Sequence, residues 1–144
     1  MEEMVETGRI PHTLGDLMTH TLITVAGEES VHDAMHLMAD NAISSLVVQP
    51  NAKGEWGILT RRDIVLKIVR GNRSPLNTKV NDICSRPVKL IPADTSIRDG
   101  SQILADANFS RLIVGQGDKP IGIVTETDIF QAVEKFGWAG ESVA

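Results

Sequence analysis

The chain has 144 residues, of which 42% are hydrophobic and 23% charged, and its formal net charge at pH 7 is −5. These values suit one globular domain with its own core. The negative charge disfavours a nucleic-acid partner, because proteins that bind nucleic acids carry basic surfaces. Cys84 is the single cysteine, so an internal disulfide is excluded, and no apolar run is long enough to span a membrane. The acidic start lacks a signal peptide's features, and we expect a cytoplasmic protein.

The sequence contains two copies of one unit. The segments GILTRRDI and GIVTETDI begin at Gly57 and Gly122, 65 residues apart. Upstream, residues 30–48 align with residues 96–114 at an offset of 66. The change in offset falls in a turn-rich loop, where a length difference is tolerated. Two matching blocks in the same order indicate a tandem repeat. The predicted parts are an N-terminal extension (1–10), a first motif (11–72), a second motif (73–136) and a C-terminal tail (137–144).

Each copy predicts the order β-α-β-β-α after a short helical turn. The first strand is expected at 22–26 or 88–92, and a helix follows from Ser30 or Ser96. A second strand, a turn and a third strand lead to another helix near Asp63 or Asp128. The apolar positions of these helices recur at helical spacing. They are Val31, Ala34, Met35 and Met38, then Ile64, Val65 and Ile68, then Ile97, Gly100 and Leu104, and finally Ile129, Phe130 and Val133.

A single copy has too little apolar surface to be stable alone. We therefore expect one α+β domain, in which the two motifs pack about a pseudo-two-fold axis with a cleft between them. Helix faces that this packing leaves uncovered favour a homodimer.

The repeated T-x-x-D motifs, Thr60 with Asp63 and Thr125 with Asp128, match the pattern of a helix cap. The S-x-x-D motifs that begin at Ser30 and Ser96 match it equally well. Spacing alone therefore favours capping over binding.

The position of the T-x-x-D motifs favours a second interpretation. Each lies at a predicted strand-to-helix junction, where free backbone N–H groups attract phosphate. A neighbouring carboxylate can accept hydrogen bonds from both hydroxyls of a ribose, so the combination suits a ribonucleotide. Arg61, Arg62 and Arg111 are candidate phosphate ligands. Glu126 and Thr127 replace the first two arginines in the second copy, so GILTRRDI is expected to be the more phosphate-competent copy.

The segment HDAMH, from His32 to His36, resembles a zinc motif. The two histidines point away from the apolar stripe and no third ligand is evident, so we interpret them as solvated and predict no metal site. No nucleophile–base pair and no glycine-rich phosphate loop occurs, and we expect no catalytic residues and no required cofactor.

The paired blocks AISSLVV…GILTRRDI and NFSRLIV…GIVTETDI resemble tandem CBS domains, the family named for cystathionine β-synthase, over residues 11–136. The resemblance implies a Bateman module that binds an adenosine-containing ligand, either AMP, ADP, ATP or S-adenosylmethionine. It also implies dimerisation through helices and regulation of another protein.

The family's pattern implies two pockets, each joining residues of both motifs. One would combine Thr60, Arg62 and Asp63 with Ser110 and Arg111, and the other would combine Thr125 and Asp128 with Ser44 and Ser45. The start of each motif would lie near the base, with Thr19 and Ile23 in one case and Ser85 and Val88 in the other.

Two functional hypotheses follow, with an enzyme as a weaker third. The first is a stand-alone regulatory module that senses an adenosyl ligand and signals to an effector protein. The alternative is a structural interaction or dimerisation module without a ligand, in which the T-x-x-D residues only cap helices.

Overall fold

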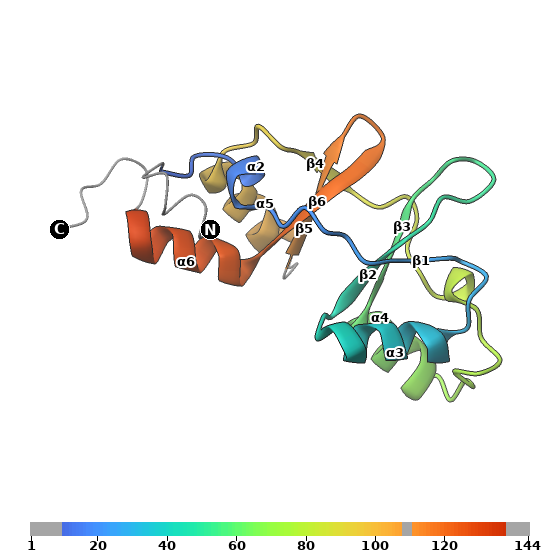
Figure 1. The fold of residues 1–144 in the computed structure, drawn as a ribbon. Coiled ribbons are helices and arrows are strands. Elements are labelled where there is room, and N and C mark those ends of the chain that lie inside the picture. Colours follow the sequence, from blue (N-terminus) through green and yellow to red (C-terminus); the bar gives the residue numbers. More distant parts are fainter. Residues whose placement is uncertain (1–9, 108–110, 138–144) are drawn as a thin grey trace. The chain divides into compact units, whose positions relative to one another are not determined.

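The computed structural model describes residues 10–107 and 111–137, which form two compact units (Figure 1). The middle unit consists of residues 22–88, and the terminal unit combines the chain up to Thr21 with the chain from Lys89 onward. The predicted α+β class and the doubled β-α-β-β-α order are confirmed. Among the described residues, none of the helices is both long and apolar enough to cross a membrane.

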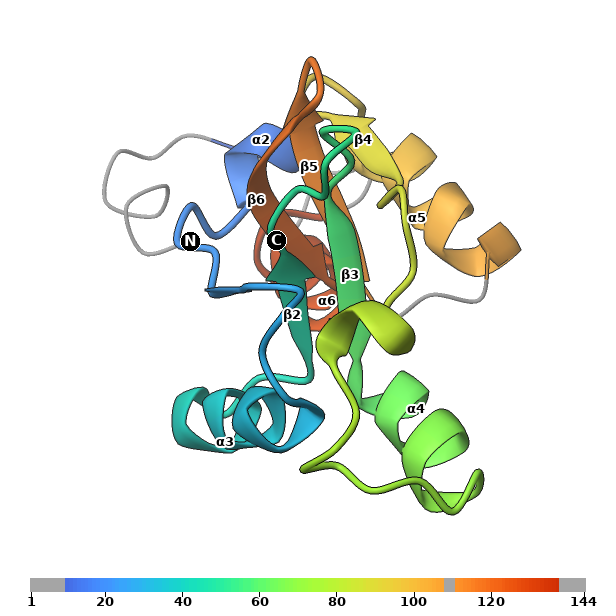
Figure 2. The ribbon, with the colours of Figure 1, turned by 90° about the vertical axis from the view of Figure 1, so that its right-hand side faces the viewer.

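The middle unit is built on a three-stranded sheet with the order β1-β2-β3. Strand β2 runs parallel to β1 and antiparallel to β3. Figures 1 and 2 show helices α3 and α4 along the same side of this sheet. The elements are β1 (Thr24–Val25), α3 (Val31–Asn41), β2 (Ser45–Val48), β3 (Gly57–Thr60), α4 (Arg61–Ile64), which continues as a π-helical turn (Val65–Val69), and a 3-10 turn (Val80–Asp82).

The terminal unit repeats this plan with the order β4-β5-β6. Strand β5 runs parallel to β4 and antiparallel to β6, with a bulge between Val114 and Gly115. The elements are α2 (Leu14–Leu17), β4 (Leu90–Pro92), α5 (Ile97–Ala107), β5 (Arg111–Gln116), β6 (Lys119–Thr125) and α6 (Glu126–Phe136).

Each unit has its own apolar core between sheet and helices. Because side chains alternate along a strand, Leu46 and Val48 of β2 point to the same face and meet Leu59 of β3 there. The helices add Val31, Ala34, Met38, Ile64 and Ile68 to this core. The corresponding core of the terminal unit contains Ile91, Leu104, Leu112, Val114, Val124 and Ala132.

The short helical turns pack on the core of the opposite copy. Helix α2 comes from the first motif, yet Leu14 and Leu17 are buried in the terminal unit. The 3-10 turn comes from the second motif, yet Val80 and Ile83 are buried in the middle unit. Each helical turn therefore packs in the unit formed mainly by the other motif, and each core contains residues of both motifs.

Backbone contacts repeat this exchange in both units. Thr13 pairs with Ser96 in the terminal unit, just as Lys79 pairs with Ser30 in the middle unit. Thr19 pairs with Ile123 in the same way that Ser85 pairs with Ile58. The two copies thus share the same exchanged arrangement.

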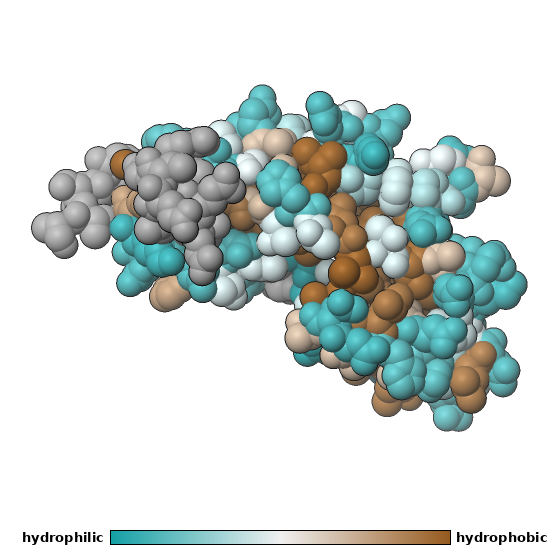
Figure 3. Space-filling view, viewed as in Figure 1, coloured by the Kyte–Doolittle hydropathy of each residue, from teal (hydrophilic) through white to brown (hydrophobic). Residues whose placement is uncertain are grey.

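Three of the predicted stripe residues are exposed instead of buried. Met35, Val65 and Phe130 are 38%, 50% and 71% exposed. Successive residues of a helix are rotated by about 100° about its axis. Val65 follows the buried Ile64 and Phe130 follows the half-buried Ile129, so both point away from the core. Figure 3 shows brown, apolar patches among the hydrophilic residues of the surface.

Candidate functional site

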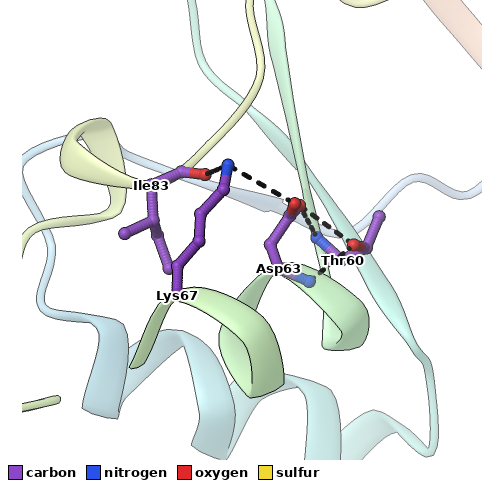
Figure 4. Close-up of polar contacts among 4 residues, drawn as sticks. All are labelled: Thr60, Asp63, Lys67 and Ile83. Carbon is purple, nitrogen blue, oxygen red and sulfur yellow. Dashed lines mark hydrogen bonds and ion pairs between the residues drawn. The ribbon is translucent and has the colours of Figure 1, made fainter. Parts of the chain in front are cut away.

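The junction between β3 and α4 holds Thr60 and Asp63 in a reciprocal cap. The Thr60 hydroxyl accepts a hydrogen bond from the Asp63 backbone N–H at 3.1 Å. Asp63 Oδ2 accepts from the Thr60 N–H and from the Thr60 hydroxyl, each at 2.9 Å (Figure 4). The predicted capping role is confirmed. The helix starts at Arg61, two residues before Asp63, because Thr60 is the cap and Asp63 occupies the third helical position.

Lys67 adds a cation to this junction. Its Nζ atom lies 3.6 Å from Asp63 Oδ1, one helical turn further along the chain. The same Nζ donates a 2.8 Å hydrogen bond to the backbone carbonyl of Ile83, and Figure 4 shows the chain of contacts from Ile83 to Thr60. Lys67 is not among the site residues predicted from the sequence, although the i,i+4 spacing of Asp63 and Lys67 is a signal for such a contact.

The junction between β6 and α6 repeats the cap with fewer contacts. Asp128 Oδ2 accepts from the Thr125 N–H at 2.9 Å, and the Thr125 hydroxyl accepts from the Asp128 N–H at 3.2 Å. The position that corresponds to Lys67 is Ala132, which is buried in the core. Within the described residues, no cation and no hydroxyl contacts the Asp128 carboxylate.

Other predicted site residues lie beside these junctions within the same unit. Ser45 of β2 pairs with Thr60 of β3, and the carbonyl of Ser44 accepts a 2.9 Å bond from the N–H of Arg61. Arg62, like Arg61, is exposed at the start of α4. In the terminal unit, Arg111 pairs with Thr125 across β5 and β6.

The residues predicted near a base are fixed through their backbone. Thr19 exchanges N–H···O bonds of 2.9 and 3.1 Å with Ile123, two residues before Thr125. The carbonyl of Ile23 accepts from Val47, and the N–H of Val88 donates to Trp56, both within the middle unit.

The predicted pockets that combine Thr60 with Arg111, and Thr125 with Ser45, draw on both units and stay predictions. What the structure does bring together is each T-x-x-D motif with the second strand of its own copy. Ser110 lies outside the described residues.

The two histidines of the HDAMH segment contact each other. His32 and His36 form an edge-to-face pair with ring centroids 4.6 Å apart, and the described residues contain no group of three His, Cys, Asp or Glu that could hold a metal ion.

Cys84 is half-buried, and this burial raises the pKa of its thiol more than the nearby Arg86 guanidinium lowers it. A thiol in this state is a poor nucleophile.

Comparison with known proteins defines the class of this fold. The family model of the CBS domain matches twice, at residues 14–70 and 80–135. The chain belongs to the CBS domain family, and its two matches form a tandem pair.

Similar proteins share this fold over most of the chain. An uncharacterised protein of Methanopyrus kandleri is 31% identical over 120 residues, which cover 83% of this chain and 61% of that protein. The chain therefore spans about three fifths of the length of that relative. Among solved structures, the hexameric CBS-CP12 protein of bloom-forming cyanobacteria has a TM-score of 0.75 and 27% identity, over 82% of this chain and 66% of that one. Hypoxic Response Protein I, solved with two coordinated zinc ions, has a TM-score of 0.71 and 25% identity, over 83% and 97%.

Proposed function

We propose that this CBS pair is a regulatory module that binds an adenosine-containing ligand at its T-x-x-D junctions and passes the signal to a partner protein. The observation that carries the proposal is the duplicated junction, at which a threonine hydroxyl and an aspartate carboxylate lie side by side at a helix start. A ribose can donate its hydroxyl protons to the carboxylate, and a phosphate can accept from the threonine hydroxyl and the nearby N–H groups. AMP, ADP and ATP contain both groups, and S-adenosylmethionine contains the ribose.

The arginines of the two copies would supply charge for the phosphate. Arg61 and Arg62 are exposed at the start of α4, and Arg111 lies on the strand next to Thr125. Guanidinium groups bind phosphate through two parallel hydrogen bonds. Phosphate-bearing ligands should therefore bind more tightly than adenosine alone.

A thermal-shift screen with AMP, ADP, ATP and S-adenosylmethionine tests the proposal. We expect at least one ligand to raise the melting temperature, and the double variant Asp63→Ala with Asp128→Ala to lose the response. Asp16→Ala is the matched control, because Thr13 and Asp16 form the same reciprocal cap at the start of α2. The Asp16 carboxylate accepts from the Thr13 N–H, and the Thr13 hydroxyl accepts from the Asp16 N–H. If millimolar concentrations of every ligand leave wild type unchanged, or if the double variant responds fully, the proposal fails.

A second candidate function is an interaction module that forms a homodimer without a ligand. Val65, Leu66 and Val69 are 50%, 39% and 69% exposed on the π-helical turn that continues α4. Exposed apolar side chains grouped on one helix are typical of a protein–protein interface. The hexameric assembly of the similar CBS-CP12 protein supports self-association. Sedimentation analysis tests this function, and a monomer at all concentrations would exclude it.

A further inference from the structure

Helices α4 and α6 are equivalent in the two copies, and they expose equivalent positions. Apart from Lys67, which bonds to Ile83, the exposed residues of α4 and its π-helical continuation recur in pairs four positions apart. They form the α4 face, which consists of Arg61, Arg62, Val65, Leu66, Val69 and Arg70. The matching positions of α6 are exposed as well. They form the α6 face, which consists of Glu126, Thr127, Phe130, Gln131, Glu134 and Lys135.

The two faces differ in charge. The α4 face carries three arginines and no acidic residue, whereas the α6 face carries two glutamates and one lysine. The basic charge continues after the helix, because residues 61–79 contain six of the chain's 14 lysines and arginines and one acidic residue. The chain as a whole has a net charge of −5, so this basic charge is concentrated in one segment. The α4 face therefore attracts an acidic surface.

The charges of both faces are available to a partner. Within the part of the chain that the structure describes, the three arginines of the α4 face form no ion pair, and neither do the glutamates of the α6 face. Arg73, just beyond the α4 face, differs, because its Nη2 atom lies 4.0 Å from Asp82 Oδ2.

Each face also has an apolar centre. Val65, Leu66 and Val69 are 50%, 39% and 69% exposed, and Phe130 in the middle of the α6 face is 71% exposed. Aromatic side chains that pack among aliphatic ones are typical anchors of protein–protein interfaces. A second copy of the chain offers both faces, and either could cover the apolar residues of α4. Charge therefore decides between the two pairings.

We propose that the α4 face of one copy pairs with the α6 face of a second copy, so that unlike helices form the dimer. This inference rests on the homodimer described above as the second candidate function, and it specifies how that dimer assembles. Pairing α4 with α4 would place arginines against arginines around the apolar centre, which opposes association. Pairing α4 with α6 places Phe130 against the aliphatic residues and surrounds this contact with unlike charges.

Charge reversal tests the pairing on the full chain. Arg61→Glu with Arg70→Glu makes the α4 face acidic, and Glu126→Arg with Glu134→Arg makes the α6 face basic. In sedimentation equilibrium, each double variant should have a dimer dissociation constant at least about tenfold above that of wild type, because attraction becomes repulsion. Combining all four substitutions exchanges the charges of the faces and should return the dissociation constant to within about threefold of wild type.

Two controls separate local from overall charge. Arg98→Glu with Lys119→Glu changes the net charge as much as the α4 double variant does, at exposed positions outside both faces. Its dissociation constant should stay within about threefold of wild type. Raising NaCl from about 0.1 M to about 1 M shortens the Debye length from about 10 Å to about 3 Å and should weaken the wild-type dimer. Far-UV circular dichroism reports whether each variant is folded, and the salt dependence requires no variant.

The outcomes separate the pairing from self-association. An α4 double variant that associates as tightly as wild type overturns the pairing, as does a wild-type dimer that salt strengthens, because both results indicate α4 against α4. A combined variant that associates as weakly as the two double variants also overturns it. A wild type that is monomeric at all concentrations refutes the homodimer together with this inference and leaves the binding of an adenosyl ligand to its own test.

Discussion

Replacing Leu14 with alanine tests whether the N-terminal turn belongs to the core of the terminal unit. Leu14 is 0% exposed, although it comes from the first motif and packs among residues of the second. Removing its three carbon atoms leaves a cavity and should cost about 3 kcal/mol of unfolding free energy. Val80→Ala is the matched change in the middle unit, where the second motif supplies a fully buried valine.

Gly100 makes the test specific for one contact. A Cβ atom added to Gly100 would lie 2.6 Å from Leu14 Cδ2 and 3.1 Å from its Cδ1. Gly100→Ala alone should therefore destabilise by about 1–2 kcal/mol, because the clash exceeds the gain of about 1 kcal/mol in helix propensity. With alanine at position 14 the clash is gone, and the new methyl group fills part of the cavity.

A double-mutant cycle measured by urea denaturation gives the coupling. We expect Leu14→Ala with Gly100→Ala to be more stable than the sum of the single changes by about 2 kcal/mol. Val80→Ala with Gly100→Ala should be additive within about 0.5 kcal/mol, because these residues lie in different cores. Additivity of the first pair would refute the exchange of the N-terminal turn.

Three further changes test the cap, the apolar surface and the thiol. Thr125→Ala should lower the unfolding free energy by about 1 kcal/mol through loss of the cap, whereas the exposed Thr127→Ala should change it by less than about 0.5 kcal/mol, as read from chemical denaturation. Val69→Glu should shift the proposed dimer towards monomer in sedimentation velocity, and an unchanged sedimentation coefficient would contradict the role of this surface. Because burial raises the pKa of Cys84, iodoacetamide should alkylate it only at higher pH than in the unfolded chain. The folded form holds the thiol proton more tightly, so this group's contribution to stability is present below the unfolded pKa and is lost as pH rises through the folded pKa.

The local features of the fold could be predicted from the sequence. The caps at Thr60 and Thr125 depend on residues three positions apart, and the helix starts at Ser30 and Ser96 follow the same rule. The doubled order of elements could be predicted from the repeat, because both copies have the same strand and helix patterns. These predictions succeed because each depends on neighbours in the chain.

The contacts between distant segments could not be predicted in the same way. A helical turn before a strand can pack on its own copy or on the other copy. The apolar pattern around Leu14 fits both alternatives equally well, so it does not predict in which core Leu14 is buried. The hydrogen bond from Lys67 to Ile83 likewise depends on where the second motif's turn packs. The exposed Val65 and Phe130 show a related limit, since the width of a buried helix face is set by its neighbours.

The exchange of turns also decides which residues surround each junction. Thr19 belongs to the first motif, yet its backbone pairs with Ile123 and so lies beside the strand that ends at Thr125. Ser85 of the second motif holds the same position beside the strand that ends at Thr60. A ligand at either junction would therefore contact or stabilise segments from both motifs, even if it touched one unit only.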